Sequence, residues 1–238
     1  MNKNIFNTNL SRYKYMRRPT LRDDNIDEKI TTYFNHLATC NYINDCVNNK
    51  NLECKNDFQN VEKLTNDECE LLFINNIEPL NLVNYGQHIW LKQIISIVEN
   101  LHLCISISSI KMNDEKFPLV YVNKEFEKTT EYNKHEILGK NCKFLQPTYK
   151  IEEEESRHIL MSRCIHNGDP TSVIITNVKK SGDLFYNLLS FIPIYDNNNT
   201  YVFCVAVQCE ITTEKKDVAE IEEIINTLKY IQSMELLL

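Results

Sequence analysis

Apolar and polar residues alternate with a period of two along much of the second half of the chain, which is typical of β-strands. Residues 101–110 and 117–123 predict two strands joined by a polar turn, and a helical stretch follows them. Three further strands are predicted at 171–178, 184–195 and 201–211. The connections KKSGD and DNNNT have the composition of turns that close antiparallel hairpins. The pattern therefore predicts an α+β fold built on a five-stranded antiparallel sheet.

Both faces of the last predicted strand are largely apolar, so both need a cover. The helices between the second and third strands can cover one face of the sheet. Two amphipathic segments, 87–100 and 213–238, flank the sheet in sequence and can cover the other face. Two interpretations of these flanking helices stay open: they only complete the core, or they also switch or dimerise. The two faces of the strand carry Cys204, Ala206 and Gln208, and Val205, Val207 and Cys209, respectively.

The first hundred residues predict a helical extension behind a polar tail. Residues 1–24 are polar and basic, without periodic apolar positions, and predict a disordered tail. Apolar residues recur at helical spacing in 27–42 and 61–74, with an Asn-rich stretch between them. The expected organisation is a tail at 1–24, a helical extension at 25–100, the sheet domain at 101–212 and a C-terminal amphipathic helix at 213–238.

Composition narrows the class of protein. The 238 residues are 42% hydrophobic and carry a net charge of -7, which argues against a nucleic-acid partner. No apolar run approaches the length of a membrane span, and the beginning of the chain lacks the apolar core of a signal peptide. Nine cysteines without a secretion signal indicate a reducing compartment, so we expect a cytoplasmic or nuclear protein. The cysteines form no Cys-x-x-Cys pair, and no metal site is expected.

One short motif points to chemistry. The stretch GKNCKFLQ, residues 139–146, resembles the Gly-x-Asn-Cys-Arg-Phe-Leu-Gln signature of LOV (light-oxygen-voltage) domains, the flavin-binding blue-light sensors of the PAS superfamily. Only the arginine differs, replaced here by Lys143. The resemblance covers about residues 101–212 and includes the hairpin NVKKSGDLFYNLLSFIPIYD and the last strand. It implies a PAS-type sheet with helices on one face and the flanking amphipathic helices on the other.

The resemblance also implies a photochemical role for one thiol. Family members bind an oxidised flavin, usually FMN, and blue light makes the motif thiol add to carbon C4a of the ring. Cys142 is the matching residue, and holding it beside the ring makes the addition an intramolecular step. For Cys104, Cys164, Cys204 and Cys209 we expect the ordinary role of buried apolar residues.

The other pocket residues follow from the same resemblance. Amides suit the flavin edge because they both donate and accept hydrogen bonds without carrying charge. The implied ring-edge contacts are Asn177, Asn187 and Gln208, with Gln208 near the reactive nitrogen N5. Further implied contacts are Asn141, Leu145 and Gln146, and the implied apolar walls are Ile165, Leu189 and Phe191.

The phosphate end departs from the family pattern. Lys143 keeps a positive charge but loses the bidentate fork of arginine. The family's second phosphate arginine aligns with Ser162, while Arg157 and Arg163 lie close by on the same predicted helix. FMN is therefore the expected cofactor, with FAD and riboflavin as alternatives.

The expected function is a light sensor without catalytic turnover. The remaining residues show no motif of an effector enzyme, and the run of four glutamates at 152–155 is interpreted as the solvated first turn of a helix. Output is then expected from the flanking helices, through rearrangement, homodimerisation or binding of an unidentified protein effector. Two alternatives stay open: a flavoenzyme, and a light-insensitive PAS module that binds another ligand.

Overall fold

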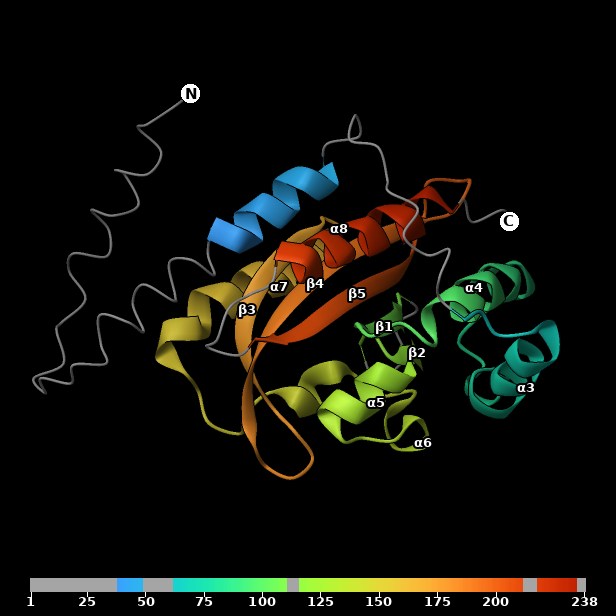
Figure 1. Cartoon of the computed structure of the whole chain (residues 1–238), viewed down its shortest axis with the longest axis horizontal. Helices are drawn as coiled ribbons and strands as arrows, with labels where there is room; N and C mark the ends of the chain where they lie inside the picture. The colour runs from blue at the N-terminus through green and yellow to red at the C-terminus, as the bar shows by residue number, and fades with distance from the viewer. Residues whose placement is uncertain (1–37, 49–61, 111–115, 212–217, 235–238) are drawn as a thin grey trace, which may run out of the picture. The chain divides into compact units, whose positions relative to one another are not determined.

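The structure is a computed structural model that describes residues 38–48, 62–110, 116–211 and 218–234 (Figure 1). The five strands form a single antiparallel sheet in the order β2-β1-β5-β4-β3. The expected α+β fold and the five-stranded sheet are confirmed. The strands are β1 (Cys104–Ser109), β2 (Leu119–Val122), β3 (Thr171–Val178), β4 (Leu184–Tyr195) and β5 (Tyr201–Ile211).

Along the chain, the helices fall into three groups: before β1, between β2 and β3, and after β5. Residues 38–48 are also helical. Before β1 the chain forms α3 (Asn66–Asn76), η2 (Glu78–Leu80) and α4 (Tyr85–Val98). Between β2 and β3 it forms α5 (Lys124–Thr130), α6 (Lys134–Ile137), η3 (Cys142–Leu145), η4 (Glu152–Glu154) and α7 (Glu155–Asn167). The last helix is α8 (Val218–Ser233).

Capping residues fix where α3 and α4 begin. Thr65 and Glu68 form a capping box at the start of α3, and Asn84 and Gln87 form one at the start of α4, with both bonds at 2.9 Å. Each box satisfies backbone N–H groups that the first helical turn leaves without partners. The predicted segments 61–74 and 87–100 are therefore helical with shifted ends. Of the predicted segment 27–42, only residues 38–42 lie among the described residues.

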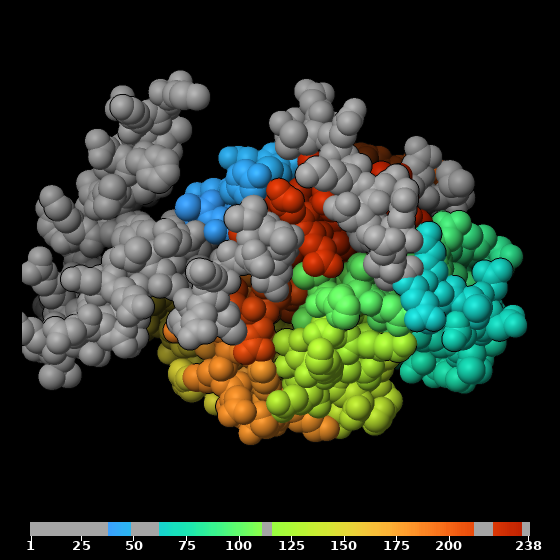
Figure 2. All heavy atoms as spheres, in the orientation of Figure 1, coloured from blue at the N-terminus to red at the C-terminus, as the bar shows by residue number. Residues whose placement is uncertain are grey.

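The flanking helices cover one face of the sheet, as expected. Trp90 of α4 stacks on Phe203 of β5 with ring centroids 5.4 Å apart. The indole Nε1 of Trp90 also donates a hydrogen bond to the carbonyl oxygen of Met234, 3.1 Å away, just beyond α8. Helix α8 packs along β4 and β5, and the helical residues 38–48 join the same apolar core beside α8 (Figures 1 and 2). Both flanks of the sheet domain therefore meet over one face.

The short helices cover the opposite face. Phe126 of α5 and Leu145 of η3 are buried there against Leu119 and Val122 of β2. Helix α7 lies along the edge strand β3. This face, with α5, α6 and η3 on it, carries the cysteine motif.

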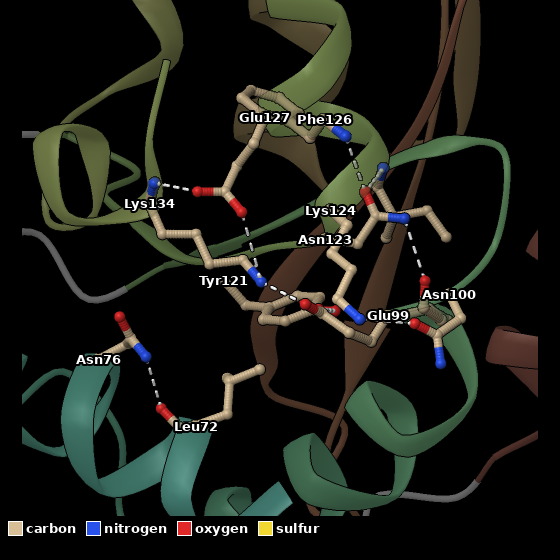
Figure 3. A network of polar contacts seen from close by, with 12 residues as sticks. Leu72, Asn76, Glu99, Asn100, Tyr121, Asn123, Lys124, Phe126, Glu127 and Lys134 are labelled. Atoms are coloured by element: carbon tan, nitrogen blue, oxygen red, sulfur yellow. Dashed lines mark hydrogen bonds and ion pairs between the residues drawn. The ribbon is translucent and has the colours of Figure 1, made fainter. Parts of the chain in front are cut away.

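A buried polar cluster joins α4 to both the sheet and the short helices (Figure 3). The Glu99 carboxylate accepts a hydrogen bond from the Tyr121 hydroxyl on β2 and binds Lys134 on α6, both at 2.5 Å. Asn123 donates to the carbonyl oxygens of Val98 and Leu103, at 3.0 and 2.8 Å. Burial, and then the Glu99 carboxylate, raise the pKa of Tyr121 well above its ordinary value.

Candidate functional site

The cysteine motif is held against β2 by its backbone. Gly139 has a φ of 81°, in the left-handed region that favours glycine. Its N–H bonds the carbonyl oxygen of Leu119 at 2.8 Å, and the Leu119 N–H bonds the carbonyl oxygen of Lys140 at 2.9 Å. The motif loop thereby extends the edge of the sheet, and its direction is fixed before η3 begins.

Asn141 then starts the short helix that carries the thiol. Its side-chain oxygen accepts a hydrogen bond from the Lys143 N–H at 3.0 Å, which is N-cap geometry. Its side-chain amide donates to the carbonyl oxygen of Lys116. The motif asparagine therefore positions Cys142, the first residue of η3.

The Cys142 thiol lies in an environment that keeps it protonated. Burial, and to a smaller extent the neighbouring Cys204 thiol, raise its pKa from 9.0 to about 12. Burial likewise raises the pKa of Cys204 to about 12. A thiolate is the reactive form in ordinary sulfur chemistry. At neutral pH Cys142 is thus an S–H group, which is not the reactive form of the side chain.

The three predicted ring-edge amides meet in one buried cluster across three strands. The Asn187 side-chain amide on β4 donates to Asn177 Oδ1 on β3 and to Gln208 Oε1 on β5, both at 2.8 Å. Gln208 Nε2 in turn donates to Ser106 Oγ on β1 at 3.2 Å. The chain of bonds therefore crosses the sheet from β3 to β1.

One atom of this cluster lacks a partner. Asn187 is only 1% exposed, and its Oδ1 has no hydrogen bond to any described residue. A buried acceptor without a donor costs about 1–3 kcal/mol. The flavin edge carries an N–H donor between two carbonyl acceptors, so the residues present fit that group.

The predicted apolar walls share the strand faces with these amides. Leu189 and Phe191 alternate with Ser190 and lie on the same face of β4 as Asn187. Leu145 and Phe191 are buried, whereas Leu189 and Ile165 are partly buried. Gln146, at the end of η3, is also partly buried.

The residues predicted to contact the phosphate differ in their exposure and in their contacts. Lys143, Ser162 and Arg163 have exposed side chains. Arg157 instead turns to the edge strand, where its Nη1 donates to the carbonyl oxygen of Ile174 at 2.5 Å. Its guanidinium also lies 3.7 Å from the Glu154 carboxylate.

Glu154 corrects the interpretation of the glutamate run. Glu152, Glu153 and Glu155 are exposed, but Glu154 is buried at 3% exposure. Its carboxylate accepts from the Thr176 backbone N–H at 2.8 Å and from the Thr176 hydroxyl at 2.7 Å. Edge strands expose such backbone donors to other chains unless something covers them. The expectation that all four glutamates form a solvated turn is therefore wrong for Glu154.

The sequence did not reveal the residues that connect the site to its surroundings. Ser106 completes the amide chain, and Glu99, Tyr121 and Lys134 form the buried cluster of Figure 3. Only Asn123 had a visible signal, because an asparagine before a helical segment is a typical N-cap; its Oδ1 accepts from the Phe126 N–H at 3.1 Å.

The described ranges hold neither a cluster of metal ligands nor a membrane-spanning helix. Among the described residues, no three histidine, cysteine, aspartate or glutamate side chains are placed to hold a metal ion. Within these ranges, every helix is too short or too polar to span a membrane.

Comparisons with known proteins indicate the family of the sheet domain. The PAS domain family profile matches residues 106–213. The blue-light photoreceptor of Listeria innocua is 37% identical over 108 residues, which are 44% of this chain and 40% of that protein. The blue-light-activated histidine kinase of Brucella ovis is 32% identical over 112 residues, which are 47% of this chain and 22% of that protein. The chain thus spans less than half the length of these relatives.

A solved structure gives a similar match. The LOV domain from the Erythrobacter litoralis EL346 blue-light activated histidine kinase is 29% identical, with a TM-score of 0.41, and covers 47% of this chain and 97% of that one.

Residues 106–213 match the PAS profile, and their described part forms most of the antiparallel sheet and holds the cysteine motif against β2. This region is therefore a PAS domain. Within that superfamily the domain is a LOV domain, as the motif at 139–146 and the relatives together indicate. The division of the chain at residues 24, 100 and 212 and the individual pocket contacts remain predictions.

Proposed function

We propose that the chain is a blue-light sensor that binds a flavin between η3, α7 and the sheet, with FMN as the expected form. The observation that carries this proposal is the buried amide cluster of Asn177, Asn187 and Gln208, which lies on the face of the sheet against which Cys142 packs. When bound and excited by blue light, the flavin supplies a ring carbon, C4a, that accepts the thiol. The light reaction is the reversible formation of a sulfur–carbon bond by Cys142.

The protein's own residues set up this reaction. Asn141 and the backbone bonds of Gly139 hold Cys142 in place. Cys142 keeps its proton on Sγ in the dark and releases it when the sulfur bonds. Asn187 Oδ1 receives the hydrogen bond of the ring edge that the protein itself does not supply.

Gln208 is the proposed sensor of the light reaction. Its Oε1 accepts from Asn187 and its Nε2 donates to Ser106. If the proton released by Cys142 moved to a flavin ring nitrogen held by Gln208, that nitrogen would change from acceptor to donor, and the other end of the Gln208 amide would make the better hydrogen bond. The amide then has to rotate or change partners, and the bond to β1 changes with it.

The flanking helices are the proposed output. The strands that carry Gln208 and Ser106 also carry, on their opposite face, Val207 and Ile105 beneath the helical core. Thr227 of α8 is fully buried there, and its hydroxyl has no partner among the described residues. An unsatisfied buried hydroxyl weakens docking of α8 against the sheet. A modest shift of β5 and β1 can therefore change how α8 packs, and with it a homodimer or the binding of a protein effector.

The test is an absorption spectrum of the purified protein before and after a blue flash. The proposal predicts a flavin band that bleaches and then returns in darkness, and that stays unbleached in Cys142→Ala. Bleaching that survives in Cys142→Ala would contradict the role of this thiol. A colourless protein that takes up no added flavin would favour a light-insensitive PAS module. Oxidation of added NADPH in the presence of an electron acceptor would instead favour a flavoenzyme.

A further inference from the structure

We infer that this site recognises the flavin ring and not its phosphate, so that riboflavin binds nearly as tightly as FMN. The inference rests on the proposed function and names which part of the ligand carries the affinity.

The first observation concerns Arg157, one of the residues predicted from the sequence to contact the phosphate. The Arg157 guanidinium bonds the carbonyl oxygens of Ile174 and Glu153, at 2.5 and 3.4 Å. It also lies 3.7 Å from the Glu154 carboxylate, which itself holds Thr176 of β3. If Arg157 moved to bind a phosphate, the buried Glu154 carboxylate would lose its arginine partner. Strand β3 would also lose the hydrogen bond to the carbonyl oxygen of Ile174. Arg157 is therefore a structural residue of the β3 edge.

The second observation concerns Ser162, which aligns with the family's second phosphate arginine. Ser162 lies on the exposed side of α7 and carries no charge. Its backbone carbonyl is hydrogen-bonded to the ring Nδ1 of His166, 2.7 Å away. Nothing at this position can form the bidentate pair that a phosphate dianion prefers.

The other charged side chains of η3, η4 and α7 include both signs. Lys143 and Arg163 are exposed, and so are Glu152 and Glu153. Lys150 is paired with Glu155 at 2.6 Å. A phosphate dianion would thus meet exposed lysine and arginine side chains in water, beside exposed carboxylates. Exposed ion pairs of this kind change an equilibrium constant by less than about tenfold.

The ring end of the site is built differently. Asn177, Asn187 and Gln208 are all buried, and they are already oriented by bonds to one another. Buried, oriented amides discriminate strongly because an unfilled partner is costly. We therefore expect the flavin ring, and not the phosphate, to provide most of the binding free energy.

The experiment compares riboflavin and FMN on the flavin-free full chain, by quenching of flavin fluorescence. We expect dissociation constants within about tenfold of each other at moderate salt. Ser162→Arg supplies the missing guanidinium and should raise the preference for FMN by about tenfold or more. Ser162→Gln, of similar size without charge, should not raise it. Arg163→Gln should change the preference by less than about threefold.

Each outcome is decisive. FMN binding more than about tenfold tighter than riboflavin in the unaltered chain would overturn the inference while leaving the flavin-binding proposal intact. Loss of that preference in Arg163→Gln would identify the residue responsible. Binding of neither flavin would overturn both the inference and the proposed function.

Discussion

The Glu99 carboxylate at the end of α4 lies 2.5 Å from Lys134 Nζ on α6, and the pair is almost completely buried (Figure 3). The two residues are 35 positions apart, and one belongs to the helical extension while the other precedes the cysteine motif by a few residues. Burying two charges is costly unless each is paired and hydrogen-bonded. The pair therefore joins α4, on one face of the sheet, to α6, on the other.

Removing one partner of this ion pair should show how much the pair contributes to the free energy of unfolding. Lys134→Met leaves the Glu99 carboxylate buried with only the Tyr121 hydroxyl as an observed partner, and we expect it to lower the free energy of unfolding by about 3 kcal/mol. The measurement is urea denaturation. The matched control is Lys128→Met, because its ion pair with Glu125 is exposed at the lysine and should cost less than about 1 kcal/mol. Equal costs for the two variants would show that the buried pair has no special role.

Buried thiols should make stability fall at high pH. The pKa of Cys204 is raised from 9.0 to about 12, chiefly by burial, so the unfolded chain loses this proton first as pH rises. The stabilisation is therefore complete below pH 9 and is lost between pH 9 and 12, by up to about 1.4 kcal/mol per pH unit. Urea denaturation of the flavin-free protein from pH 7 to pH 10.5 measures it.

The control for that pH dependence is Cys204→Ala. This variant should show a shallower decline above pH 9 than the unaltered chain. A difference in stability between the two proteins that stays constant across the range would refute the assignment to this thiol.

Gln208 should be needed for output more than for the light reaction. Gln208→Leu keeps the apolar bulk but removes the bonds to Asn187 and Ser106. We expect it still to bleach under blue light while the light-induced change in hydrogen exchange of α8 is largely lost. Comparing exchange in dark and light for both proteins measures this. A full light response of α8 in Gln208→Leu would mean that the signal leaves the site by another route.

The single tryptophan should report the packing of α8. Trp90 is buried, stacks on Phe203 and donates to the carbonyl oxygen of Met234. If α8 loosens in the light, water reaches the indole, so its fluorescence should shift to longer wavelength and recover in darkness. Cys142→Ser is the control, because it lacks the thiol that reacts. A shift of equal size in Cys142→Ser would contradict a link between the thiol and α8.

Patterns among residues that are close in the sequence predicted most of the fold. Alternation along 184–195 and 201–211 identified both strands with their full lengths, and two apolar faces on the last strand required the flanking helices. The motif at 139–146 identified the class of site, because its residues act together within one loop.

Contacts between distant residues could not be predicted in this way. The pairing of Glu99 with Lys134 depends on how two helices pack around the sheet. Glu154 has the same neighbours in sequence as three exposed glutamates and differs only because β3 lies beside it. The sequence likewise does not reveal that Arg157, a predicted phosphate contact, donates a hydrogen bond to the carbonyl oxygen of Ile174.

The S–H stretching vibration reports whether light converts the Cys142 thiol into a carbon–sulfur bond. The raised pKa of Cys142 means that the dark protein carries an S–H group there at neutral pH. A light-minus-dark infrared spectrum of the flavin-loaded protein should therefore show the loss of one S–H band, which returns in darkness and is missing in Cys142→Ser. Visible bleaching without loss of an S–H band, or an unchanged band loss in Cys142→Ser, would contradict the account.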